Sequence, residues 1–253
     1  MIPEPPLLII APMADDLDLA ALPWCETAAE NISVNHAKFK NLEMVEVIVD
    51  AMPFILSRLT AAETSQQFTA EKCEPLFCDL PSSEESAIRI AIGDNLASAK
   101  HLPEVNRRLL LLGNWIGDSL AATAAAWMPS RTLTNFTYYA KTVGEYLTDG
   151  PFPSLFQISF SADRNGHFVT SGLHYFAGQE IRLTVAAGYS HAEVTERLVR
   201  IIEAIATHGK IEGPARSRGM VPGESLIYSP SNDLGHVDIA IRNELFDVDP
   251  AKI

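Results

Sequence analysis

The stretch from Pro151 to Val185 constrains the fold more than any other part of the chain. Apolar and polar residues alternate near its start and near its end, which is the pattern of strands with one buried face. Two segments rich in turn-forming residues, 163–166 and 177–178, divide it into three parts. The pattern therefore predicts three consecutive strands joined by two turns.

If both turns are regular, the apolar side chains of these three strands do not all lie on the same face of the sheet. Regular pairing places Phe160 on one face of the sheet, but Ile181 and Leu183 on the other. Either the sheet is covered on both faces, or an extra residue in the middle strand restores a common face. We favour such a bulge and place it at Gly172, because glycine inside a strand often marks one.

The segment after Val185 predicts the clearest helix in the chain. Ser190 and Glu193 have the spacing of a capping box, in which each side chain satisfies the other residue's backbone amide. Gly209 is a typical C-terminal stop. Apolar residues recur between them at helical intervals, at Val194, Leu198, Ile201, Ile202 and Ile205. A helix is therefore expected over 190–208.

The first half of the chain predicts further elements. Alternation indicates a hairpin over 43–59, and Pro103 begins an apolar helical pattern that runs to about residue 126. Leu7 to Ala11 has the length and composition of an edge strand. Residues 60–86 show little periodicity and are interpreted as a mobile connection.

These elements predict a fold of the α+β class, with a single domain over 1–253. We expect an antiparallel sheet built from hairpins, with the 103–126 and 190–208 helices packed on it. Hydrophobic residues make up 47% of the chain and charged residues 20%, which is a globular composition with enough apolar surface for a core.

The formal net charge of −13 limits the partners that the chain can have. Such a field repels the phosphates of nucleic acids and of anionic membranes, and no large basic patch offsets it, so a basic protein surface is the favoured partner. No apolar run is long enough to span a bilayer, and Leu7 to Ile10 is too short for a signal core. A cytoplasmic location is expected.

Cys25, Cys73 and Cys78 are an odd number of cysteines in a long chain. This count argues against a disulfide framework and fits a reducing compartment. Four residues separate Cys73 from Cys78, and the paired spacings of zinc sites are missing. Reduced structural thiols are expected, with no metal and no cofactor.

Two groups of polar residues are candidates for a functional site. His167, His174 and Glu180 lie in the three-strand stretch, where a histidine beside a carboxylate could act as a general acid and base. Arg216 and Arg218 form a compact cationic loop that could hold a carboxylate or a phosphate. Each group also has a plain structural interpretation, as packing in the sheet and as a solvated loop.

From Leu133 onward the chain resembles an uncharacterised bacterial family, a domain of unknown function. The resemblance rests on the helix NFTYYAKTVGEYL, the strand PFPSLFQISF and the motif TSGLHYFAGQEIRL, followed by an amphipathic helix. Ala177 separates Phe176 from Gly178, whereas family members tend to have the aromatic residue directly before glycine. The resemblance implies features of packing and turns, and no set of catalytic residues.

Two functions follow as hypotheses. The first is a non-catalytic cytoplasmic module that binds another protein. The alternative is a small-molecule hydrolase that uses His167 or His174 with a carboxylate. A compact pocket that gathers titratable groups would favour the hydrolase, whereas an exposed apolar or acidic face would favour the binding module.

Overall fold

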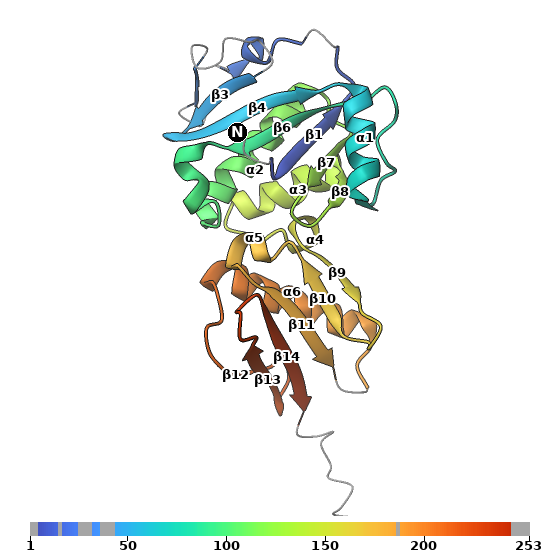
Figure 1. The fold of residues 1–253 in the computed structure, drawn as a ribbon, viewed down its shortest axis with the longest axis vertical. Helices are drawn as coiled ribbons and strands as arrows, with labels where there is room; N and C mark the ends of the chain where they lie inside the picture. The colour runs from blue at the N-terminus through green and yellow to red at the C-terminus, as the bar shows by residue number, and fades with distance from the viewer. Residues whose placement is uncertain (1–4, 15–16, 25–31, 36–43, 186–187, 244–253) are drawn as a thin grey trace, which may run out of the picture. The chain divides into compact units, whose positions relative to one another are not determined.

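The computed structural model of the protein divides into two compact units, unit 1 (residues 1–157) and unit 2 (158–253), shown in Figure 1. Each unit combines helices with a mostly antiparallel sheet, which confirms the α+β class. Where one sheet was expected, the described strands form two. The structure describes residues 5–14, 17–24, 32–35, 44–185 and 188–243.

The described part of unit 1 contains an eight-stranded sheet. Its strands are β1 (Leu7–Ala11), β2 (Ile32–Asn35), β3 (Met44–Val49), β4 (Met52–Leu59), β5 (Glu74–Leu76), β6 (Ser86–Ile92), β7 (Ala124–Trp127) and β8 (Thr132–Asn135). They lie in the order β2-β3-β4-β6-β1-β7-β8-β5, and β5 pairs with β8 in parallel while the other neighbours are antiparallel. The hairpin predicted over 43–59 is confirmed as β3 and β4.

Helices cover both faces of this sheet (Figure 1). In the described residues of unit 1 the helices are α1 (Ala61–Glu71), α2 (Pro103–Ser119), α3 (Phe136–Leu147) and α4 (Ser154–Gln157), with 3-10 turns at Leu19–Ala21 and Asp94–Ala99. No helix in the described ranges has both the length and the apolar character needed to cross a membrane.

The prediction of an edge strand at Leu7 to Ala11 is wrong, because β1 lies between β6 and β7. A Cβ placed on Gly113 of α2 would overlap the Leu7 side chain, so this face of β1 packs on α2. Leu8 lies on the opposite face and shares a core cluster with Phe68 of α1. A strand covered on both faces has a continuous apolar sequence rather than an alternating one.

Residues 60–86, where the sequence shows little periodicity, contain the helix α1 and the short strand β5. The Thr60 hydroxyl accepts a hydrogen bond from the Glu63 amide (3.3 Å), and the Glu63 carboxylate accepts one from the Thr60 amide (2.8 Å). This capping box begins α1. The helix was missed because its sequence, AAETSQQFTAE, offers Phe68 as its one large buried side chain rather than a stripe.

α2 begins at Pro103 as predicted, but it ends at Ser119 rather than near residue 126. Ala121 adopts a left-handed conformation (φ 49°), and the following alanines pair with β1 as strand β7. Gly117 lets α2 approach α3 closely, because a Cβ there would overlap the Phe136 ring. The alanine-rich residues at the end of the helical pattern, 124–126, therefore form a strand instead of a helix.

The described part of unit 2 contains a six-stranded sheet in the order β12-β13-β14-β11-β10-β9. In chain order its elements are β9 (Ser159–Ala162), β10 (Phe168–Ser171), α5 (His174–Ala177), β11 (Glu180–Val185), α6 (His191–His208), β12 (Ala215–Arg218), β13 (Glu224–Pro230) and β14 (His236–Asn243). β11 pairs with β14 in parallel, and the other neighbours are antiparallel. α6 lies against one face of this sheet (Figure 1).

Register resolves the conflict within the three-strand stretch, and the bulge expected at Gly172 is wrong. Phe160 is paired with Thr170, and Phe168 with Leu183. Paired residues point to the same face of a sheet, and so do residues two apart on one strand, such as Phe168 and Thr170. Phe160 and Leu183 therefore share a face without an extra residue. Gly172 instead takes a positive φ of 100° and leads the chain from β10 into α5.

The predicted helix over 190–208 is confirmed as α6. Its capping box joins Ser190 and Glu193, and Gly209 is its C-cap. The apolar stripe of α6 is buried, and so are Ile181, Leu183, Val237, Ile239 and Ile241 on the covered face of the sheet. The core of unit 2 therefore lies between α6 and this face.

Candidate functional site

The structure places His167 in the hairpin between β9 and β10. Its ring Nδ1 lies 3.2 Å from the Asp163 carboxylate, which also accepts hydrogen bonds from the backbone amides of Asn165 and His167. The backbone hydrogen bond from His167 is the main cause of a lowered pKa for Asp163. This carboxylate therefore holds the turn together.

Glu180, at the start of β11, binds the chain that enters α5. Its carboxylate accepts hydrogen bonds from the Thr170 hydroxyl (2.7 Å) and from the backbone amides of Gly172 (2.8 Å), Leu173 (3.3 Å) and His174 (3.0 Å). His174 is exposed and meets Glu180 through its backbone amide. The three predicted residues are thus divided between two turns, and Glu180 acts as a cap for α5.

Replacing Glu180 tests this capping role. Glu180→Ala should lower the free energy of unfolding by about 2 kcal/mol, because a charged acceptor of several hydrogen bonds is lost. His174→Ala, which keeps the backbone amide, should change it by less than about 0.5 kcal/mol. Urea denaturation of both variants gives the comparison. A larger loss for His174→Ala than for Glu180→Ala would contradict the assignment.

Arg216 and Arg218 lie on β12 at the edge of the sheet, rather than in a loop. The Arg216 guanidinium donates a hydrogen bond to the Ser225 hydroxyl (3.2 Å), and Arg218 is paired in register with Ser225. Both arginines line a hollow of about 340 Å³. The structure therefore brings these two predicted residues together at one end of β12.

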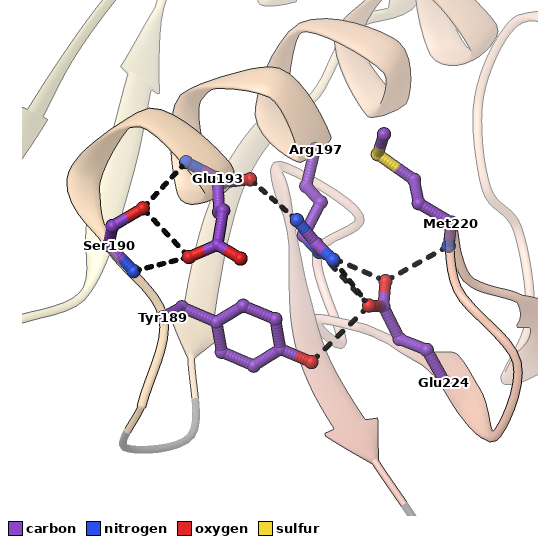
Figure 2. Close-up of polar contacts among 6 residues, drawn as sticks. All are labelled: Tyr189, Ser190, Glu193, Arg197, Met220 and Glu224. Carbon is purple, nitrogen blue, oxygen red and sulfur yellow. Dashed lines mark hydrogen bonds and ion pairs between the residues drawn. The ribbon is translucent and has the colours of Figure 1, made fainter.

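A buried ion pair between Arg197 of α6 and Glu224 of β13 lies beside this end of the strand (Figure 2). The Arg197 Nε and Nη2 groups donate to the Glu224 carboxylate at 2.8–3.1 Å. The Arg197 side chain is 5% exposed and the Glu224 side chain 0%. The pair joins the helix to the sheet inside unit 2.

Other groups complete the hydrogen bonding of this pair. Glu224 also accepts from the Met220 amide (3.1 Å) and the Tyr189 hydroxyl (3.3 Å), and the Tyr189 ring lies under the Arg197 guanidinium. Burial alone would raise the pKa of Glu224, but the hydrogen bonds from Arg197 and Met220 outweigh it and lower the pKa. Hydrogen bonding to Glu224 raises the pKa of Arg197. Both side chains are therefore charged at neutral pH.

A second hollow, of about 200 Å³, opens between α6 and the β12–β13 hairpin. We call it the α6 hollow. It is lined by Arg197, Arg200, Ile201, Ala204, Ser217, Arg218, Gly219, Met220, Glu224, Leu226 and Tyr228. A Cβ on Gly219 would overlap the Glu224 carboxylate, so the backbone can approach Glu224 this closely only because residue 219 is glycine.

The sequence reasoning missed both members of the buried pair. Arg197 stands between Val194 and Ile201 in the apolar stripe of α6, at the same helical spacing as its neighbours. A charge inside such a stripe needs a buried partner, which is a signal that the sequence does contain. Its partner Glu224 could not be identified, because it comes from a strand 27 residues away.

A different surface lies in unit 1, at the segment that begins with β5. Phe77 is 62% exposed and has a positive φ of 65°, which is unusual for a large side chain. The Asn135 side chain donates to the Phe77 carbonyl (2.7 Å), and the Tyr138 ring lies 5.0 Å from the Phe77 ring. Leu80 is also exposed, by 53%. Contacts with the start of α3 therefore hold Phe77 at the surface.

This segment, residues 74–84, is also acidic, and we call it the Phe77 segment. Glu74, Asp79 and Glu84 are all exposed in it. Unit 1 contains 20 of the 32 acidic residues of the chain and 10 of the 19 basic ones. Most of the net negative charge of −13 therefore belongs to unit 1.

The described ranges contain no group of three or more histidine, cysteine, aspartate or glutamate side chains that could hold a metal ion. Cys73 is buried and Cys78 partly buried, and both are thiols; Cys25 lies outside the described residues. Burial is the main cause of a raised pKa for the Cys78 thiol.

Comparison of the chain with protein-family models, with curated proteins and with solved structures yields no match. The resemblance of the region from Leu133 onward to an uncharacterised bacterial domain family therefore stays a prediction.

Proposed function

We propose that the chain is a non-catalytic protein-binding module that holds a basic partner on the Phe77 segment. The observation that supports this most strongly is the exposure of Phe77, 62%, in a position fixed by Asn135 and Tyr138. A fixed aromatic side chain at the surface loses little conformational freedom on binding, and such residues are typical anchors of protein interfaces.

The charge around Phe77 indicates the chemistry of the partner. In the sequence, Phe77 is flanked by three residues with exposed carboxylates, Glu74, Asp79 and Glu84. Unit 1 is also acidic as a whole. Such a surface attracts a cationic partner from a distance and repels an anionic one. The partner is therefore a basic protein segment with an apolar side chain for the anchor, and a cytoplasmic setting is part of the same proposal.

One contact fits the hydrolase alternative, because the His167 ring Nδ1 lies 3.2 Å from the Asp163 carboxylate. The Glu180 carboxylate is occupied by backbone amides, and the Asp163 carboxylate beside His167 holds a turn. Neither His167 nor His174 lines the two hollows described above, where a small substrate would be held. We therefore keep the binding module as the single proposed function.

Partner capture tests the proposal. With the full chain as bait, Phe77→Ala should weaken capture of a partner at least about tenfold, because it removes the anchor. Leu102→Ala is the matched control, since Leu102 is 45% exposed in the same unit but lies outside the segment. Asp79→Asn should weaken capture and make it less sensitive to salt.

Three outcomes would contradict the proposal. The first is equal capture by Phe77→Ala and the parent chain. The second is an equal loss in the Leu102→Ala control. The third is turnover of an ester, phosphoester or amide substrate that disappears in His167→Ala or His174→Ala. Under the proposal, both histidine variants keep full capture.

A further inference from the structure

Besides Arg197, which is paired with Glu224, two further arginines line the α6 hollow. Arg200 comes from α6 and Arg218 from β12, and both are exposed residues. In the described part of the chain neither guanidinium has an ion-pair or hydrogen-bond partner. Two like charges on the wall of one hollow of about 200 Å³ repel each other. An anion between them would remove this repulsion.

The rest of the hollow is largely apolar. Ile201 and Ala204 contribute from α6, and Leu226 contributes from β13. The Met220 side chain and the Tyr228 ring add further apolar surface, while the Tyr228 hydroxyl lies 3.2 Å from the Ser217 hydroxyl. A bare inorganic ion would leave this surface in contact with water. The hollow therefore suits a ligand with an apolar body as well as a negative charge.

The acidic residue in the hollow does not oppose such a ligand. Glu224 is tied to Arg197 by three hydrogen bonds, so its charge is neutralised inside the unit (Figure 2). Since the buried pair is neutral overall, Arg200 and Arg218 are the charged lining residues that remain without an ion-pair partner among the described residues. The pair also holds α6 at a fixed distance from the β12–β13 hairpin, which keeps the hollow open.

We propose that the α6 hollow binds a small carboxylic acid that has an apolar or aromatic body. The carboxylate lies between Arg200 and Arg218, whose planar guanidinium groups match its two oxygens, and the body lies on Ile201, Ala204 and Leu226. The volume of about 200 Å³ has room for a body of about one ring. This site is in unit 2 and does not depend on the partner proposed for unit 1.

Titration of the full chain with four matched probes tests the site. Phenylacetate has both parts of the proposed ligand, acetate lacks the apolar body, benzyl alcohol lacks the charge, and inorganic phosphate is an anion without a body. Two-dimensional NMR should show saturable shifts of the amides of 217–220 with phenylacetate. The other three probes should bind at least about tenfold more weakly.

Variants locate the bound acid. Arg200→Gln and Arg218→Gln should each weaken phenylacetate binding about tenfold, because each loses a charge-assisted hydrogen bond. Arg164→Gln is the matched control, because it removes the same charge from an exposed position of the β9–β10 hairpin. Ala204→Leu adds a larger side chain to the wall of the hollow, and it should block binding while the spectrum of the folded protein is kept.

Each contrary result overturns the proposal. One such result is an absence of saturation with phenylacetate. Another is an affinity for acetate or inorganic phosphate equal to that for phenylacetate. A third is a loss of phenylacetate binding in Arg164→Gln equal to the loss in Arg200→Gln or Arg218→Gln. Unchanged binding in Ala204→Leu would also place the ligand elsewhere. A variant that unfolds is identified by its spectrum, and Arg218→Lys then replaces Arg218→Gln, with a smaller loss expected because it keeps the charge but not the planar fork.

Discussion

Arg197→Met is expected to lower the free energy of unfolding by about 3–5 kcal/mol, because it leaves the Glu224 carboxylate buried without its partner. The double variant Arg197→Met/Glu224→Leu should recover most of this loss, since two apolar side chains of similar volume need no partner. Urea denaturation measures both. A single variant as stable as the parent chain would show that the pair contributes nothing to unit 2.

The same variant should respond to pH in a defined direction. The folded-state pKa of Glu224 lies below its ordinary value of 4.5, so the pair contributes its full stability above that value and loses it as the pH falls through the lowered pKa. Without Arg197, burial raises this pKa instead, and protonation relieves the uncompensated charge. The stability difference between the parent and Arg197→Met should therefore narrow from pH 7 to pH 4.

Leu198→Asp is the second substitution with a large expected effect. Leu198 is 0% exposed in the stripe that α6 buries, and an unpaired carboxylate there costs several kcal/mol, which is a large share of ordinary stability. Unit 2 should unfold in the full chain. The NMR resonances of residues 158–243 report this directly.

Ala204→Asp is the matched control for Leu198→Asp. It introduces the same charge on the same helix at an exposed position, and helix propensity alone predicts a loss of about 0.5–1 kcal/mol. A folded Leu198→Asp protein with the stability of this control would show that the stripe is not buried.

Local patterns predicted the elements whose signals lie within one segment. The capping box at Ser190 and the spacing of Val194 and Leu198 were sufficient for α6, because a helix satisfies its own backbone. The apolar run of β1 was harder, since a short run of this kind does not show whether one face or both are covered. Its central position depends on β6 and β7, which lie far away in the sequence.

Partners from distant segments could not be predicted. The pairing of β12 with β13 makes Arg216 and Arg218 part of a sheet edge, although their polar sequence has the composition of a loop. Arg200 and Arg218 line the α6 hollow together, and the local sequence around either residue does not indicate that the other lies beside it. Single residue types were therefore visible in the sequence, whereas their combination into a site was not.

The position of β14 has a consequence for synthesis of the chain. β14 (residues 236–243) is inserted between β13 and β11, so it joins one part of the sheet made of β12 and β13 to another made of β11, β10 and β9. A ribosome releases residues in chain order, and these two parts emerge before the strand that connects them. Until then each part has an open strand edge, and unit 2 completes its sheet only after translation has passed residue 243.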